Sequence, residues 1–151
     1  MHSELIKIAK NFRNKLEDFI KSSSIYIGDE LRNFPGGACQ ISSAMLGLHL
    51  VELGYENVLI QSGKRQILGD FNFENHCWLI LDEQIIIDIT ADQFEDCNTE
   101  IIVTSQSDFH NTFSEVYRKK ICDDLLSRPG YRRNDGYFKV YKELMADNFY
   151  N

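Results

Sequence analysis

The chain has 151 residues, of which 43% are apolar and 26% are charged, with only two prolines and nine glycines. This composition excludes a disordered chain, and the length fits a single domain over residues 1–151. The formal charge of −7 gives no general attraction to a phosphate backbone, so we expect no nucleic-acid partner.

The N-terminal segment has neither the long apolar run nor the small-residue cleavage site of a secretory signal. No window approaches the roughly 18 apolar residues of a membrane span, so no membrane partner is expected. These features predict a cytoplasmic protein, although export by a route without a signal leaves no mark in a sequence. In a reducing compartment the four cysteines are expected to be free thiols. The sequence does not indicate an oligomeric state.

The first third of the chain has helical patterns. The spacing of apolar residues predicts a helix from Ser3, as its N-cap, to about Ser22. A loop over residues 22–37 follows, because the sequence Pro-Gly-Gly at 35–37 blocks a continuous helix. A second helix is predicted over residues 39–53, ending at Gly54. The apolar residues of this segment lie on nearly all sides of the helix, which indicates a central, buried helix.

The rest of the chain has mainly strand patterns. Strands are predicted over residues 57–62, 76–81, 84–90 and 101–105, with a longer polar and aromatic connection over residues 63–75. A helix is predicted from about Ser114 to Leu126, and residues 136–150 fit either a strand or a helix. Helices followed by a mostly antiparallel sheet indicate the α+β class.

Two glycines lead into Cys39, the first residue of the predicted buried helix. The unpaired N–H groups and the dipole of a first helical turn stabilise a thiolate. The glycines let other backbone approach, which leaves room for a substrate carbonyl against the Cys39 N–H. The alternative is that Cys39 is a small buried hydrophobic residue, and this stretch alone does not decide between the two.

Asp88 lies within an apolar strand, where an unpaired carboxylate is costly. A three-residue loop between the strands over 76–81 and 84–90 would place His76 and Asp88 on one face, whereas a two-residue turn would separate them. Asp88 could then orient the imidazole while its other nitrogen reaches the Cys39 thiol. Alternation would turn Cys77 to the opposite face as a core thiol. Taken singly, His76 and Asp88 also fit a strand-end histidine and a turn-capping acid.

Three short motifs in this order resemble those of the transglutaminase-like cysteine superfamily, over residues 34–94. They are Gly37-Ala38-Cys39 followed by Ser43, then His76-Cys77-Trp78, then Asp88-Ile89-Thr90. The resemblance implies a papain-like core, in which a Cys-bearing helix packs on an antiparallel sheet carrying His and Asp. It also implies Cys39 as nucleophile, His76 as general base and acid, and Asp88 as the group that orients the imidazole.

The resemblance implies a cysteine hydrolase that cleaves an amide of a protein or peptide, as a peptidase or a deamidase, through a thioester. A transglutaminase-type acyltransferase and an inactive binding module on the same fold are the alternatives. Many transglutaminases have an aromatic residue after the nucleophile, where this chain has Gln40. No cofactor is expected, and no metal either, because the cysteines and histidines lack the paired spacing of a zinc site.

Further site residues follow from the resemblance and the pattern. Papain-like enzymes commonly place an amide side chain before the cysteine as an oxyanion donor, which makes Asn33 the candidate and Gln40 and Gln93 its rivals. Phe71, Phe73 and Trp78 are predicted to line the substrate cleft, with Phe71 and Phe73 on one wall. Trp78 shares the His76 face, where it either shields the imidazole or belongs to the core. Two other histidines, His49 in the buried helix and His110 in a polar segment, receive no role.

Overall fold

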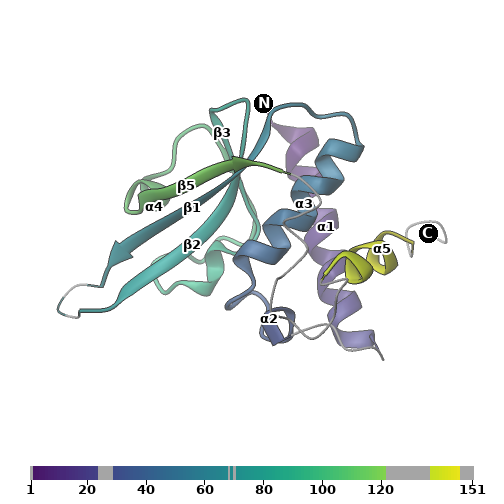
Figure 1. Ribbon diagram of the computed structural model, residues 1–151, viewed down its shortest axis with the longest axis horizontal. Coiled ribbons are helices and arrows are strands. Elements are labelled where there is room, and N and C mark those ends of the chain that lie inside the picture. The colour runs from purple at the N-terminus through teal and green to yellow at the C-terminus, as the bar shows by residue number, and fades with distance from the viewer. Residues whose placement is uncertain (1, 24–28, 68, 70, 122–136, 147–151) are drawn as a thin grey trace.

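The computed structural model describes residues 2–23, 29–67, 69, 71–121 and 137–146 (Figure 1). The helices are α1 (Ser3–Ser22), α2 (Asp29–Arg32), α3 (Cys39–Glu52), the 3-10 turn η1 (Ala91–Gln93), α4 (Asp108–Asn111) and α5 (Phe138–Ala146). The strands are β1 (Val58–Gln66), β2 (Phe73–Leu81), β3 (Ile85–Asp88), β4 (Ile102–Thr104) and β5 (Ser114–Lys120). They form one antiparallel sheet in the order β4-β3-β2-β1-β5, which confirms the predicted α+β class.

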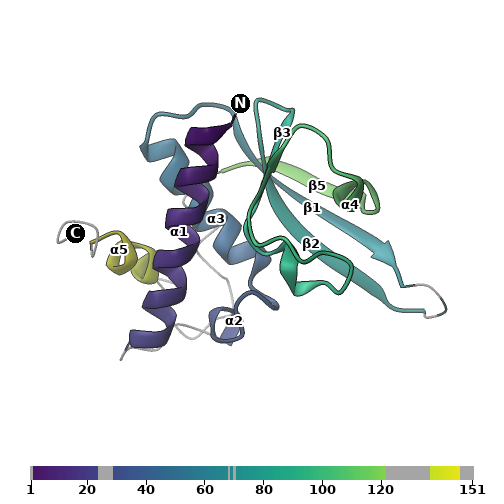
Figure 2. The same ribbon diagram turned by 180° about the vertical axis from the view of Figure 1, so that it is seen from behind.

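Helix α3 lies against one face of the sheet, where it contacts β1 and β2. Helix α1 lies beside α3, with the Phe12 ring stacked on His49 at 5.8 Å, and α5 packs on α1 (Figures 1 and 2). Nine of the residues in α3 are buried, because the sheet and the other helices surround it. The prediction of a central, buried helix is therefore confirmed. No helix in the described part of the chain is long and apolar enough to cross a bilayer.

The sheet is also covered on the face away from α3. The side chains of β2 alternate: Cys77, Leu79 and Leu81 belong to the apolar cluster with α3, whereas Trp78 and Ile80 belong to a second cluster. This second cluster includes Phe113 and the partly buried rings of Phe94 and Phe109. Strand β2 is therefore buried on both faces in its C-terminal part.

Three predictions about the elements are corrected by the structure. Residues 63–66 and 73–75 are strand, because β1 and β2 pair from Val58↔Leu81 to Gln66↔Phe73. Residues 114–120 form β5 and not the start of a helix, since their backbone pairs with β1; residues 122–126 of the predicted helix lie outside the described part. Ser3 is the first residue of α1, whose N-cap position is His2. The undecided segment contains a helix, α5.

A buried arginine on α1 ties this helix to the chain that follows β3. The Arg13 side chain is only 4% exposed, and its guanidinium forms two hydrogen bonds with the Asp92 carboxylate at 2.7 and 2.8 Å. It also donates to the Ile89 carbonyl at 2.9 Å, to the Glu100 carbonyl at 3.1 Å and to the Glu17 carboxylate at 2.8 Å. Arg13 thus fixes the segment that begins directly after Asp88.

We expect Arg13→Met to lower the free energy of unfolding by about 3 kcal/mol, because it leaves the buried partners of the guanidinium without their donor. Urea unfolding followed by circular dichroism measures the change. Lys10→Met, on the exposed side of the same helix, removes the same charge and should change stability by less than about 0.5 kcal/mol. Equal unfolding midpoints for the two variants would contradict this account of Arg13.

Candidate functional site

The β2–β3 hairpin brings His76 and Asp88 together. Leu81 pairs with Ile85, so residues 82–84 form a three-residue connection, as the prediction required. The Leu79↔Ile87 register then places Asp88 diagonally across from His76 on the same face. The His76 Nε2 and Asp88 Oδ2 atoms lie 2.6 Å apart, and both side chains are fully buried. The predicted pairing of these two residues is confirmed.

The Asp88 carboxylate has hydrogen-bond partners on both oxygens. Its Oδ2 also lies 2.7 Å from the Nε2 of His110, and its Oδ1 accepts the Thr90 backbone N–H at 2.9 Å. Burial by itself would raise the pKa of Asp88, but the nearby imidazoles of His76 and His110 hold it well below its ordinary value. Asp88 is therefore an ionised carboxylate inside the protein.

The ionised carboxylate determines which nitrogen of each imidazole carries the proton. Because it can only accept hydrogen bonds, both His76 and His110 place an N–H at Nε2. In a neutral imidazole the other nitrogen, Nδ1, is then an acceptor. The Nδ1 of His110 lies 2.6 Å from the Ser107 hydroxyl, whose oxygen accepts the His110 backbone N–H at 3.1 Å. The Nδ1 of His76 is buried and has no hydrogen-bond partner.

Aromatic rings surround the His76 imidazole. The ring centroids of Phe94, Trp78, Phe113 and Phe109 lie 4.9, 5.5, 5.7 and 6.0 Å from it. Trp78 is only 2% exposed, so the structure places it in the core around the imidazole and not on an open surface. These rings keep water from the His76–Asp88 hydrogen bond, which strengthens it.

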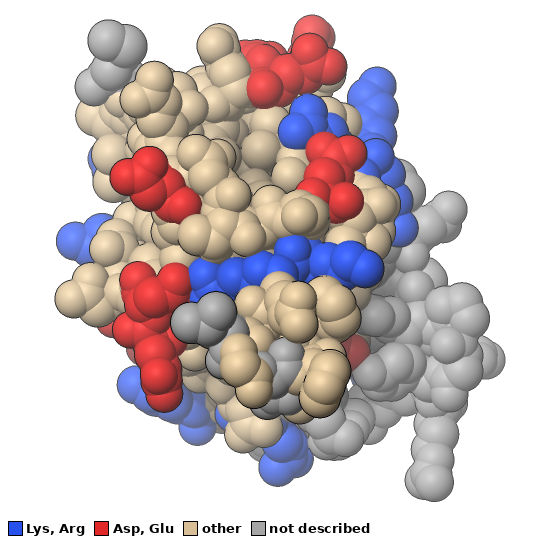
Figure 3. Space-filling model, turned by 90° about the vertical axis from the view of Figure 1, so that its left-hand side faces the viewer, with Lys and Arg blue, Asp and Glu red and all other residues tan. Residues whose placement is uncertain are grey.

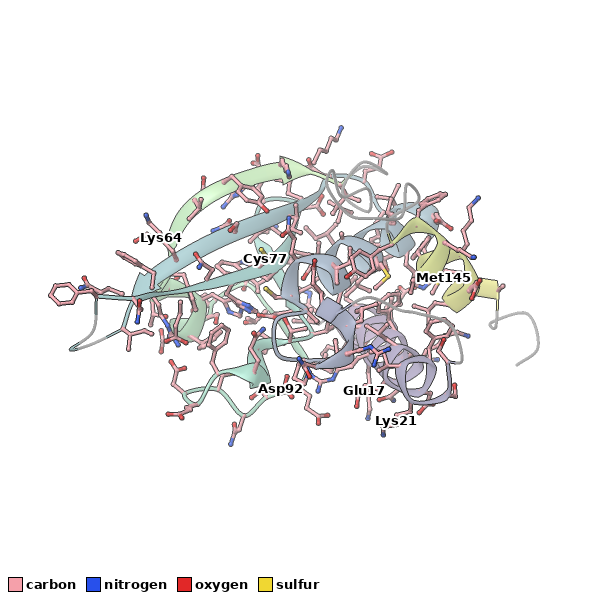
Figure 4. The ribbon with its side chains drawn as sticks, turned by 60° about the horizontal axis from the view of Figure 1, so that its bottom comes forward. Glu17, Lys21, Lys64, Cys77, Asp92 and Met145 are labelled. Carbon is pink, nitrogen blue, oxygen red and sulfur yellow. The ribbon has the colours of Figure 1, made fainter. Side chains whose placement is uncertain are left out.

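Cys39 is the first residue of α3, as predicted, and is partly buried. Its thiol lies close enough to the thiol of Cys77 for the two to interact, and Figure 4 shows Cys77 between the sheet and α3. Cys77 faces away from His76 and into the apolar cluster under α3, so the prediction that alternation makes it a core thiol is confirmed. The odd-numbered side chains of β2 therefore face the helix that carries Cys39, whereas His76 faces the other layer. The structure therefore joins His76 to Asp88 without a hydrogen bond between His76 and the Cys39 thiol.

The contact between the two thiols changes their acidity in opposite directions. The interaction with Cys39 lowers the pKa of Cys77, against the effect of burial, and the side chains of Ser62 and Tyr117 act in the same direction. The same interaction and burial raise the pKa of Cys39. A raised pKa is contrary to the stabilised thiolate that we expected for Cys39 at the start of α3.

The three candidates for an oxyanion donor have different surroundings. Asn33 is exposed in the turn before α3. The Gln40 amide donates to the Tyr117 hydroxyl at 3.2 Å. The Gln93 amide donates to the Thr90 carbonyl at 3.0 Å, and its oxygen accepts the Gly37 backbone N–H at 3.3 Å. Gln93 therefore connects the glycine loop before Cys39 with the segment after Asp88.

Phe71 and Phe73 lie at the far end of the β1–β2 hairpin. Phe71 is 95% exposed and Phe73 is 51% exposed, with the Lys64 ammonium 5.1 Å from the Phe73 ring centroid. Figure 4 shows that Lys64 lies farther along the hairpin from the helices than Cys77. A band of Lys and Arg side chains, bordered by Asp and Glu, crosses the hairpin end of the molecule (Figure 3). That the two phenylalanines form a wall of a substrate cleft stays a prediction.

His110 is the site residue that the sequence analysis missed. Its local signal is Ser107, three residues earlier, whose hydroxyl caps the short helix α4 by accepting the His110 N–H. This spacing predicts a capped turn, but it does not indicate that the imidazole reaches Asp88, which lies 22 residues away. Only the packing of α4 against the sheet makes that contact.

The side chains of His76, Asp88 and His110 form a set that could hold a metal, since one ligand atom of each lies within 4.8 Å of the others. Three N–H donors already satisfy the carboxylate, and Nε2–H tautomers leave no lone pair directed at a metal. A metal about 2.0–2.2 Å from each ligand would also need the nitrogen and oxygen atoms farther apart than 2.6 and 2.7 Å. The absence of a metal stays our expectation.

The depressed pKa of Asp88 predicts an acid-dependent stability. Its ordinary value is 3.8 and its folded value is lower, so the unfolded state binds the proton more tightly. The contribution of Asp88, on the order of 2 kcal/mol, is complete above about pH 5 and is lost as the pH falls towards 2. Asp88→Asn should therefore destabilise the protein most near neutral pH, and the difference from wild type should shrink in acid.

Urea unfolding between pH 2.5 and pH 7 measures this difference, the range being chosen to cover roughly the titration window of a carboxylate. Asp82→Asn, on the exposed turn of the same hairpin, removes an equal charge without breaking a buried hydrogen bond and is the matched control. A stability gap between wild type and Asp88→Asn that is constant over the whole range would contradict the depressed pKa.

His110→Leu should destabilise the protein by about 1–3 kcal/mol and raise the pKa of Asp88, because the carboxylate loses one of its donors. His110→Gln should cost less, since an amide N–H can replace the imidazole donor. Nitrogen-15 NMR of the wild type should show both His76 and His110 protonated at Nε2, and carbon-13 NMR follows the Asp88 titration. If the pKa of Asp88 is the same in His110→Leu as in the wild type, His110 does not act on the carboxylate and is not part of the site.

Comparisons with known proteins do not assign this chain to a family. No protein-family model matches it, and no curated protein and no solved structure does so either. What Cys39, His76, Asp88 and His110 do must therefore follow from their own contacts and chemistry.

Proposed function

We propose that this protein is a cysteine-dependent amide hydrolase of the cytoplasm, a peptidase or deamidase acting on a protein or peptide, with the papain-like core of the transglutaminase-like superfamily. One observation carries the proposal. Asp88 holds His76 through Nε2, and the remaining nitrogen, Nδ1, is buried without a partner. Buried polar atoms without partners are uncommon and need an explanation. The unpartnered atom is explained if His76 is a general base and its Nδ1 accepts the proton of the Cys39 thiol during the reaction.

The contacts of Cys77 support the placement of the nucleophile. Cys77 touches the Cys39 thiol and directly follows His76 in β2, so the thiol and the imidazole flank the same part of the strand. Cys39 also lies close enough to Asp88 for the carboxylate to raise the pKa of its thiol. In the proposed reaction the Cys39 thiol leaves the Cys77 sulfur and approaches Nδ1 of His76, which requires the site to rearrange because α3 and the His76 side chain lie on opposite faces of β2.

The reaction then follows from the roles of these side chains. His76 takes the thiol proton at Nδ1, and the Cys39 sulfur attacks the carbonyl carbon of the amide. Backbone N–H groups in the first turn of α3, which have no intrahelical acceptor, face the developing oxyanion, together with an amide side chain such as that of Gln40. His76 returns the proton to the leaving amine, and water hydrolyses the thioester. Asp88 keeps the imidazole in the required tautomer throughout.

Mass spectrometry of acid-quenched reactions with a library of peptides and peptide amides tests this proposal. We expect wild-type protein to carry an acyl group on Cys39, and Cys39→Ala to show neither adduct nor product. His76→Ala should lose nearly as much turnover, and Asp88→Asn should lose less, because Asp88 acts by orientation. Cys97→Ala is the matched control, since Cys97 is also a partly buried free thiol and should keep full activity.

The same experiment separates the alternatives. A primary amine added to the reaction diverts the acyl group in a transglutaminase-type acyltransferase and leaves the products of a hydrolase unchanged. A binding module gives bound peptide without an adduct or a product. Turnover that persists in Cys39→Ala would overturn the proposal, because the chemistry would then use another residue.

A further inference from the structure

The second thiol at the start of α3 has no role in the proposed hydrolysis. Cys39 comes from the first turn of the helix and Cys77 from the middle of β2, and their thiols lie close enough to interact directly. One helical turn after Cys39, the Ser43 hydroxyl donates to the Cys77 carbonyl at 3.4 Å. The two sulfurs are therefore brought together by α3 and β2, which pack on each other, and not by a loop.

The surroundings of the pair favour a reactive thiolate. The side chains of Ser62 and Tyr117 act on the Cys77 thiol and, together with Cys39, lower its pKa below the ordinary value. Cys77 itself is only 6% exposed, whereas Cys39 is partly exposed, so a small oxidant reaches the pair at Cys39.

We propose that Cys39 and Cys77 form a modification site at which a hydroperoxide converts the two thiols into a disulfide. The geometry points to this site because two cysteines from separate elements already hold their sulfurs in contact. Cys97, the other free cysteine in the described part of the chain, forms no such pair. Disulfide formation brings the two sulfurs to about 2.05 Å, with a Cβ–S–S–Cβ dihedral angle near 90°.

The proposed oxidation balances in two steps. The proton between the sulfurs moves from Cys39 to Cys77, and the Cys39 thiolate attacks the terminal oxygen of the hydroperoxide. The O–O bond breaks, Cys39 becomes a sulfenic acid, and the released alkoxide takes the proton from Cys77 and leaves as an alcohol. The Cys77 thiolate then attacks the Cys39 sulfur, the S–O bond breaks, and hydroxide leaves. Two electrons pass from the sulfurs to the peroxide.

The consequence for activity rests on the proposed function. A disulfide at Cys39 removes the nucleophile, and reduction by an external dithiol restores it, so the pair would switch the hydrolase off under oxidative conditions. Formation of the disulfide itself depends only on the two sulfurs and needs no substrate.

Peptide mapping of the full chain tests the site. Wild-type protein is treated with one equivalent of hydrogen peroxide, its free thiols are blocked with iodoacetamide, and the digest is analysed without reduction. We expect the main product to be a peptide pair linked through Cys39 and Cys77, which separates on addition of dithiothreitol. Cys97→Ala, the matched control, should give the same linked pair.

The variant Cys77→Ala gives the complementary result. Without the second thiol, the sulfenic acid on Cys39 should persist long enough for capture by dimedone, and excess peroxide should carry it to an acid that dithiothreitol does not reduce. Linkage of Cys39 to Cys97, or irreversible oxidation of Cys39 in wild type without a disulfide, would overturn the proposal. A linked pair found in a protein without hydrolase activity would leave this site standing while the proposed function fails.

Discussion

The structure around the candidate site depends on one buried negative charge, the Asp88 carboxylate. A carboxylate taken out of water must recover its hydrogen bonds from the protein, and Asp88 does so with N–H donors from three places in the chain. His76 comes from β2, Thr90 from the residues directly after β3, and His110 from α4. Since none of these elements can move without removing a donor, the carboxylate fixes the relative positions of all of them.

Arg13 strengthens this arrangement from the helical side. Its guanidinium connects α1 to the Ile89 carbonyl and to Asp92, the residues that flank Thr90. The segment that carries a donor to Asp88 is therefore bonded to α1 as well as to the sheet. Gln93 adds a further link from this segment to Gly37 in the loop before Cys39. The two ends of the candidate site, the helix start and the hairpin, are thus joined through polar contacts and apolar packing together.

How far the sequence predicted this structure depended on whether the signal was local. The periodicity of apolar residues located α1 and α3, and the parity of a three-residue connection placed His76 and Asp88 on one face. Parity could not say which face of β2 meets α3, because both faces are buried and apolar residues lie on each. Strand β5 was assigned to a helix since its pairing partner, β1, lies about fifty residues earlier, and pairing at that distance leaves no local pattern. The contact of His110 with Asp88 was missed for the same reason.

Strand β2 carries two chemically different neighbours, an imidazole and a thiol, on its two faces. A slip of this strand by one residue would leave an imidazole under the apolar side of α3 and a thiol next to a buried carboxylate. Neither position would offer the displaced group a suitable partner, so the sheet would lose stability on both faces at once. The alignment of β2 with its neighbours is therefore protected twice, by hydrogen bonding on one side and by hydrophobic packing on the other. This small protein thereby excludes misaligned pairings of the β1–β2 hairpin without a disulfide among the described residues.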